Sequence, residues 1–139
     1  MAEEGKKVIA IDIGGTKVAS ALVTLGDGQT PRVEGYGRRP TEAQLGGRHV
    51  LEVALGSARR VIELAGGSVD GVGVSTGGVV DPRTGDITYA NDMMPGWGGT
   101  ALGSAVTSEF GLPCSVLNDV HAHALGEARH GAGHGKDSV

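Results

Sequence analysis

The chain has 139 residues, a formal net charge of -4, 39% hydrophobic residues, 26 glycines and only 3% aromatic residues. This length predicts a single domain, whose core has to be built from valine, alanine, leucine and isoleucine with many tight turns. The acidic balance argues against a nucleic-acid-binding domain, because such domains normally carry a basic face.

The first third of the chain predicts three strands in a meander. An apolar run from Val8 to Ile13 is typical of a fully buried strand. Two further strands are predicted over Lys17 to Leu25 and over Arg32 to Arg39, and Gly26-Asp27-Gly28 supplies the turn between them.

A glycine-rich turn, DIGGTK, separates the first two strands and begins at Asp12. Gly14 and Gly15 can take positive φ values, which let backbone N–H groups converge on an oxyanion, and Thr16 and Lys17 add a hydroxyl and a positive charge. A carboxylate beside phosphate requires Mg²⁺ or its waters in between, which is the role left for Asp12. A tight β-hairpin turn with Asp12 as a cap explains the segment equally well.

A helix is predicted next, from Arg48 to Leu64. Its apolar residues recur at helical spacing, and three charged residues are expected to face outward: Arg59, Arg60 and Glu63. Gly66 and Gly67 are expected to end it.

The second half predicts an alternation of strands and helices. Gly71 to Ser75 has so little side-chain bulk that we expect this strand to be covered on both faces. The later predicted elements are a turn at Asp81 to Asp86, a short strand at Ile87 to Tyr89, a helix capped by Thr100 and running to Phe110, a strand at Ser115 to Leu117, and a helix from Val120 to Arg129.

This order indicates an α/β domain, in which ligands bind near the carboxyl ends of the strands. Four polar segments fall at such ends: Asp12 to Lys17, Ser75 to Asp81, Asn91 to Trp97, and Asn118-Asp119. Their common placement predicts a binding site there.

With these segments, the chain resembles the N-terminal lobe of the ROK family of sugar kinases, within the actin-like, hexokinase-like ATPase superfamily. The resemblance covers nearly the whole chain. Four motifs carry it: DIGGTK at Asp12 to Lys17, GVGVSTGGVVDPRTGDI at Gly71 to Ile87, the loop from Asn91 to Trp97, and LNDVHAHALGE at Leu117 to Glu127. It implies an α/β, ribonuclease H-like or actin-like ATPase domain, a mixed sheet with a leading antiparallel meander and flanking helices.

The resemblance also implies an activity, an ATP-dependent transfer of a phosphoryl group to a hexose, as in glucokinase. The implied phosphate-binding residues are Gly14, Gly15, Thr16 and Lys17, with Asp12 orienting Mg²⁺ directly or through water. The implied catalytic base is Asp119, and the implied sugar-binding residues are Gly77, Gly78, Asn91, Asn118 and Asp119.

Three points stay open at this stage. The family commonly has Pro-Gly where this chain has Gly77-Gly78. Trp97 could stack on a sugar or anchor the core, and Asn118 and Asp119 could do no more than cap the following helix.

The resemblance further implies that a C-terminal lobe is missing. We expect residues 1–130 to form the N-terminal lobe and residues 131–139 to begin the connection to the other lobe. The isolated chain is then expected to be inactive, to lack the family's zinc motif, and to form a homo-oligomer or to dock with the missing lobe.

Two alternative functions remain: an N-acetylmannosamine or other amino-sugar or glucoside kinase, and a non-catalytic sugar-binding module related to ROK repressors. Because seven residues precede Val8 in this sequence, we expect no helix-turn-helix of the kind that repressors carry. The histidines His121, His123, His130 and His134 are expected to be solvated or interfacial rather than metal ligands, since the first two lie on different faces of a helix.

Cellular location and cysteine chemistry can also be predicted. The first residues, MAEEGKK, lack the apolar region of a signal peptide, and no window reaches a membrane-spanning length, so we expect a cytoplasmic protein without a membrane partner. Cys114 is the single cysteine, which excludes an intrachain disulfide, and its apolar neighbours favour a buried, inert thiol.

Overall fold

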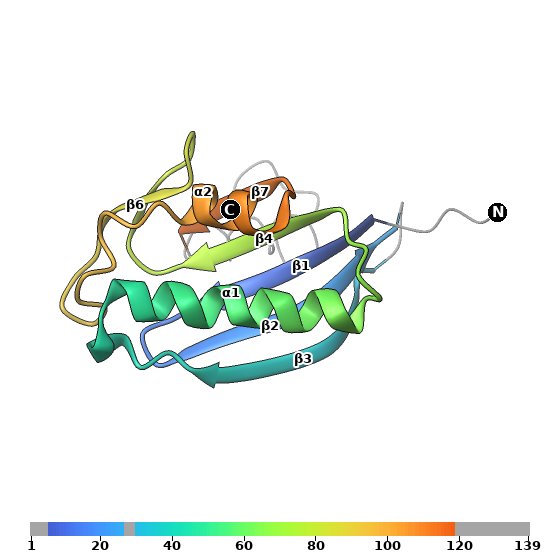
Figure 1. The fold of residues 1–139 in the computed structure, drawn as a ribbon, viewed down its shortest axis with the longest axis horizontal. Helices are drawn as coiled ribbons and strands as arrows, with labels where there is room; N and C mark the ends of the chain where they lie inside the picture. The colour runs from blue at the N-terminus through green and yellow to red at the C-terminus, as the bar shows by residue number, and fades with distance from the viewer. Residues whose placement is uncertain (1–5, 27–29, 119–139) are drawn as a thin grey trace.

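A computed structural model describes residues 6–26 and 30–118, and within them a mixed sheet carries two α-helices on one face (Figure 1). The elements in chain order are β1 (Lys6–Ile13), β2 (Lys17–Leu25), β3 (Arg32–Pro40), the 3₁₀ turn η1 (Ala43–Leu45), α1 (Gly47–Leu64), β4 (Gly71–Thr76), β5 (Val79–Asp81), β6 (Asp86–Tyr89), α2 (Leu102–Phe110) and β7 (Cys114–Asn118).

The strand order of the main sheet is β3-β2-β1-β4-β7. The first three strands pair antiparallel, whereas β4 pairs parallel with β1 and β7 pairs parallel with β4. The predicted α/β class and the leading antiparallel meander are therefore confirmed.

The core lies between the sheet and α1. Alternate residues of β1 are buried on this face, and so are the residues that α1 turns toward them: Ile9, Ile11, Ile13, Val50, Val53, Ala54, Ala58 and Val61. The helical spacing read from the sequence is thus confirmed. Arg60 of α1 was expected to face outward, but it is half-buried. Its Nη2 donates to the carbonyl of Ser20 at 3.2 Å and to that of Gly35 at 2.8 Å.

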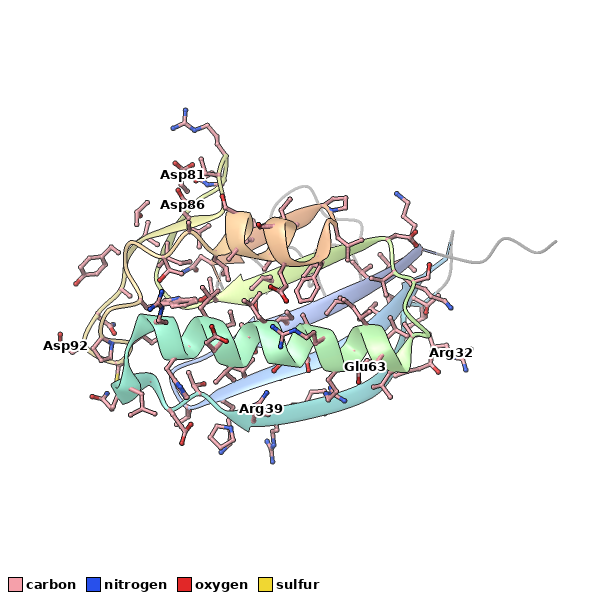
Figure 2. All side chains as sticks on the ribbon, viewed as in Figure 1. Arg32, Arg39, Glu63, Asp81, Asp86 and Asp92 are labelled. Carbon is pink, nitrogen blue, oxygen red and sulfur yellow. The ribbon has the colours of Figure 1, made fainter. Side chains whose placement is uncertain are left out.

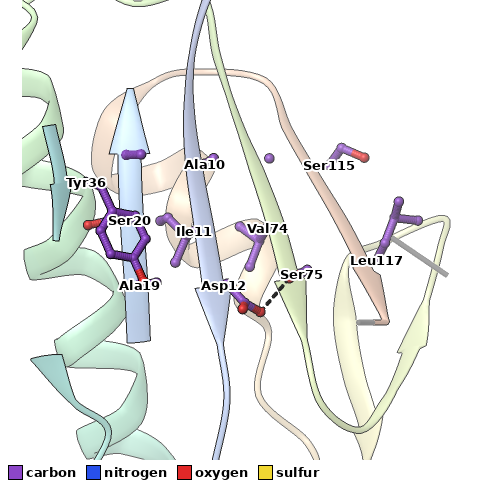
Figure 3. A pocket seen from close by; sticks show the side chains of 12 residues that line it. Ala10, Ile11, Asp12, Ala19, Ser20, Tyr36, Val74, Ser75, Ser115 and Leu117 are labelled. Carbon is purple, nitrogen blue, oxygen red and sulfur yellow. Dashed lines mark hydrogen bonds between the residues drawn. The ribbon is translucent and has the colours of Figure 1, made fainter. Parts of the chain in front are cut away.

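The opposite face of the sheet is built from small side chains. Within the described residues it is hollowed into a cavity of about 470 Å³ (Figure 3). Val72 and Val74 of β4 are buried, while Gly73 and Ser75 line this cavity. In the described part of the chain, this face of β4 is partly open at Gly73 and Ser75, so cover on both faces stays a prediction.

A two-stranded hairpin, β5 and β6, projects beyond the main sheet (Figure 1). The strand β5 was not predicted. Asp81 and Asp86 pair at its tip (Figure 2), and Gly85, at φ +77°, donates its N–H to the Asp81 carbonyl at 2.8 Å. The predicted reversal is confirmed, and the backbone N–H of Arg83 lowers the pKa of Asp81.

The start of α2 differs from the prediction. The helix begins at Leu102 with Ala101 as its N-cap, and no side chain caps it. Thr100 instead donates its N–H to the Trp97 carbonyl at 3.2 Å and accepts the Ile87 N–H at 2.8 Å. These two bonds hold it one residue too early to cap the helix, so the predicted cap is wrong.

The predicted end of α1 is correct, since Gly66 and Gly67 take φ values of +81° and +94° just after the helix. No helix in the described ranges is both long and apolar enough to cross a membrane.

Candidate functional site

The carboxyl ends of three parallel strands lie side by side. The register aligns Ile13 of β1 with Thr76 of β4, and Thr76 with Asn118 of β7. One residue earlier, Asp12 is aligned with Ser75, whose Oγ donates to Asp12 Oδ1 at 2.7 Å (Figure 3). Three of the four predicted polar segments therefore meet at one edge of the sheet.

Ser75 was not among the predicted site residues. It alternates with valines in GVGVST, so it faces away from the buried Val74 and toward the side of Asp12. That alternation is the signal that could have identified it.

The segment after β1 is a tight hairpin. Gly14 donates its N–H to the Lys17 carbonyl at 2.9 Å. Gly14 and Gly15 do not take positive φ values, so that expectation is wrong. The cross-bond closes the turn with ordinary backbone angles, and a Cβ on Gly14 would lie 3.3 Å from the Lys17 oxygen.

A hairpin of this kind can still bind an anion. In the described part of the chain, the N–H groups of Gly15 and Thr16 donate to no acceptor. The exposed Lys17 has no acidic partner among these residues either. The hairpin thus offers two backbone donors and one ammonium group to a negatively charged ligand.

The loop between β4 and β5 is held to both neighbouring strands. Gly77 donates its N–H to the Ile13 carbonyl at 3.2 Å, and Asn118 Nδ2 donates to the Gly78 carbonyl. Gly78 has φ +97°, and a Cβ there would lie 2.7 Å from the Tyr89 oxygen. Glycine is therefore required at this position, and the predicted Gly77, Gly78 and Asn118 form one unit.

The Asn91 to Trp97 loop completes this edge. Asn91 is exposed, and its Oδ1 accepts the N–H of Met93 at 2.9 Å. Trp97 is fully buried and donates from Nε1 to Thr76 Oγ1 at 3.0 Å, which in turn donates to the Gly77 carbonyl at 3.0 Å. Trp97 is therefore a core anchor that supports the Gly77 loop, which answers the question left open by the sequence.

Several predicted features lie outside the described residues: Asp119, the helix over Val120 to Arg129, and the four histidines from His121 to His134. No group of three or more histidine, cysteine or acidic side chains able to hold a metal occurs among the residues that the structure describes. Mg²⁺ is usually held by one or two carboxylates together with phosphate oxygens and waters. Asp12 can supply one such carboxylate, and the other ligands would come from the nucleotide and from water.

Cys114 begins β7, away from this edge, and is half-buried. Burial raises the pKa of its thiol from 9.0 to about 11. Because the thiolate is the reactive form, at pH 8 iodoacetamide should modify the folded chain about 100-fold more slowly than the urea-unfolded chain. The rate should keep rising with pH up to about 11. Equal rates in the two states would contradict this burial.

Comparison with known proteins gives a consistent result. The ROK family model matches residues 8–139. A ROK hexokinase from Thermus thermophilus has a TM-score of 0.76 and 32% identity, covering 93% of this chain and 40% of that one. A ROK family glucokinase from Streptomyces griseus, solved in complex with glucose and AMPPNP, has a TM-score of 0.78 and 30% identity, covering 93% and 38%.

A third structure extends the range of substrates among the relatives. A putative N-acetylmannosamine kinase from Listeria monocytogenes has a TM-score of 0.73 and 27% identity, covering 93% of this chain and 40% of that one. The chain spans 42% and 38% of the length of the first two curated relatives that it matches.

Proposed function

The chain belongs to the ROK family, and we propose on this basis that it is the N-terminal lobe of an ATP-dependent hexose kinase similar to glucokinase. The observation that carries the proposal is the convergence of polar groups at the strand ends. Ser75 bonds to Asp12 beside the Gly14 to Lys17 hairpin, and Asn118 bonds to Gly78 in the loop that follows the neighbouring strand β4. A kinase needs a phosphate site next to a hydroxyl site, and in this proposal the two lie side by side at this edge.

The hairpin supplies the phosphate half of the site in this proposal. The N–H groups of Gly15 and Thr16 and the ammonium of Lys17 bind the terminal phosphates, and Gly14 closes the turn. Asp12 is the residue that would hold Mg²⁺, directly or through water, with its carboxylate fixed by Ser75. When bound, the ion neutralises charge on the transferred phosphoryl group.

The neighbouring loops supply the sugar half. Gly77, Gly78, Asn91 and Asn118 present backbone and amide groups to sugar hydroxyls. Asn118 ends β7, and Asp119 follows it in the sequence. We assign Asp119 the role of general base, which takes the proton of the attacking hydroxyl.

The proposal also covers the whole protein. Residues 1–130 form this lobe, residues 131–139 begin the connection to a C-terminal lobe, and the isolated chain does not turn over, because both halves of the cleft are needed to align the reactants. The surface left open either docks that lobe or associates with a second copy. The enzyme would act in the cytoplasm.

The proposal can be tested by a coupled assay of ADP release. The assay compares chain 1–139 with a fusion in which the C-terminal lobe of the Streptomyces griseus glucokinase follows Val139, across glucose, fructose and N-acetylmannosamine. We expect turnover of glucose by the fusion and none by the chain alone. Turnover by the chain alone would contradict the proposal that it holds only half of the active site. A folded but inactive fusion would contradict the proposal that the protein is a hexose kinase.

An amino-sugar kinase is the second candidate. The likeness to the putative N-acetylmannosamine kinase favours it, although the identity is lower than for the glucokinase and the hexokinase. Preference of the fusion for N-acetylmannosamine over glucose in the same assay would support this alternative.

A further inference from the structure

A single threonine holds both sides of the hairpin tip. Thr41 follows β3 and is fully buried. Its Oγ1 donates to the Gly14 carbonyl at 2.7 Å, and its N–H donates to the Thr16 carbonyl at 2.9 Å. These two carbonyls flank Gly15, so one residue fixes the backbone on either side of it.

The hairpin itself provides little of this order. Its only cross-bond runs from the Gly14 N–H to the Lys17 carbonyl, among the described residues. Glycine loses more conformational freedom on folding than any other residue, so two adjacent glycines need support from outside the turn. Thr41 supplies it, 27 residues away in sequence.

The segment around Thr41 is also linked to α1. The next residue, Glu42, has φ +54° and ψ +49°, a left-handed conformation that is uncommon for a residue with a side chain. Its Oε1 lies 2.9 Å from Nε2 of His49 on α1. The segment that carries Thr41 is therefore tied both to the hairpin and to the long helix.

We propose that Thr41 is a positioning residue for the binding of condensed phosphate, acting through the hairpin that it clamps. The Gly14 carbonyl belongs to the same peptide group as the Gly15 N–H, so Thr41 sets the orientation of that donor directly. By holding the Thr16 carbonyl, it also fixes the peptide group that follows Thr16. The inference rests on the proposed function, in which this hairpin binds the terminal phosphates of ATP. A hydrogen bond to a charged phosphate weakens steeply when its donor turns away, so the clamp can control affinity without touching the ligand.

Two pairs of chains isolate the hydroxyl. Wild type and Thr41→Val have nearly the same side-chain shape, and Thr41→Ser and Thr41→Ala differ by the hydroxyl alone, so either pair suffices if one valine or alanine variant fails to fold. Each ¹⁵N-labelled chain is titrated with inorganic tripolyphosphate and with Mg·ATP at millimolar concentrations, and the amide signal of Gly15 is followed.

We expect the dissociation constant for both phosphates to rise at least about tenfold in Thr41→Val relative to wild type, and in Thr41→Ala relative to Thr41→Ser, as for the loss of about one hydrogen bond to a charged group. Hydrogen exchange at the Gly14 amide should accelerate in the same two variants, while exchange at Ile9 and Ile11 in the core stays unchanged. Thr41→Ser should bind within about twofold of wild type, because it keeps both hydrogen bonds.

Two results would overturn the inference and leave the proposed function intact: equal phosphate affinity within both pairs, or a loss of affinity that only accompanies faster exchange throughout the core. If neither phosphate moved the amide signals of Gly15, Thr16 or Lys17 in the wild type, that result would instead contradict the proposed phosphate site itself.

Discussion

Asp119→Ala, introduced into the two-lobed fusion, should lower the turnover number for hexose phosphorylation about 10²- to 10⁴-fold and change sugar affinity only a few-fold. The physical reason is that phosphoryl transfer depends mainly on positioning and charge neutralisation, with one base needed at the attacking hydroxyl. Asn118 and Gly78, which are bonded to each other, would still hold the sugar loop in place. The loss should therefore appear in the turnover number and not in the sugar KM.

The measurement is a steady-state ADP-release assay with glucose varied at saturating ATP. Asp119→Asn keeps the size and removes the basic oxygen, so it should be as inactive as Asp119→Ala. Asp86→Asn serves as the matched control, because Asp86 lies on the projecting β5–β6 hairpin (Figure 2). If Asp119→Asn retained wild-type turnover, Asp119 would be a helix cap and not a base.

Gly47→Ala should be among the most destabilising single substitutions in the described part of the chain. Gly47 is buried at the first turn of α1, and a Cβ there would lie 2.1 Å from the Gly96 carbonyl oxygen and 2.8 Å from its carbon. Both are backbone atoms, so neither can rotate away. We expect a loss of about 3 kcal/mol in the free energy of unfolding, a large share of the 5–15 kcal/mol typical of a domain.

The same substitution at Gly56 provides the control within α1. There, the added Cβ would meet only Nη1 of Arg39 at 2.9 Å, the far end of a flexible side chain. Alanine is the better helix former by about 0.5–1 kcal/mol, so Gly56→Ala should be neutral or slightly stabilising. Urea unfolding followed by circular dichroism measures the free energy of unfolding of both variants. Equal stability of Gly47→Ala and wild type would show that α1 and the Gly96 backbone are not in close contact.

The elements with strong hydrophobic periodicity could be predicted from the sequence. The strand Lys17–Leu25 was predicted with its observed bounds, and α1 was predicted to within one residue of its start. In α1 the apolar residues recur at helical spacing, and β2 is a nine-residue run rich in alanine and valine, so that a local reading suffices for each. The strand β5, Val79–Asp81, has only three residues and no pattern long enough to detect.

The site could be predicted in its composition but not in its internal contacts. Gly77, Gly78 and Asn118 were predicted, and the structure joins them at one edge. The partners that hold them were not found, because Trp97 reaches Thr76 from 21 residues away and Thr41 reaches Gly14 from 27. Such long-range hydrogen bonds depend on the fold, and no local sequence pattern indicates them.

The backbone of the hairpin was also predicted wrongly. Glycines in DIGGTK suggested positive φ values, yet Gly14 and Gly15 have none. At Gly14 the small size serves close approach instead, since a Cβ there would lie 3.3 Å from the Lys17 oxygen. Composition alone does not separate these two uses of glycine.

In the proposed enzyme, one edge of the sheet carries a phosphate half and a sugar half of a kinase site. The most direct test is a ¹H–¹⁵N correlation spectrum of the 139-residue chain, recorded with Mg·ATP and with glucose separately. We predict that Mg·ATP shifts the amide signals of Gly15, Thr16 and Lys17, and that glucose shifts those of Gly77, Gly78 and Asn118. Shifts confined to α2 or the β5–β6 hairpin, or none with either ligand, would contradict the account.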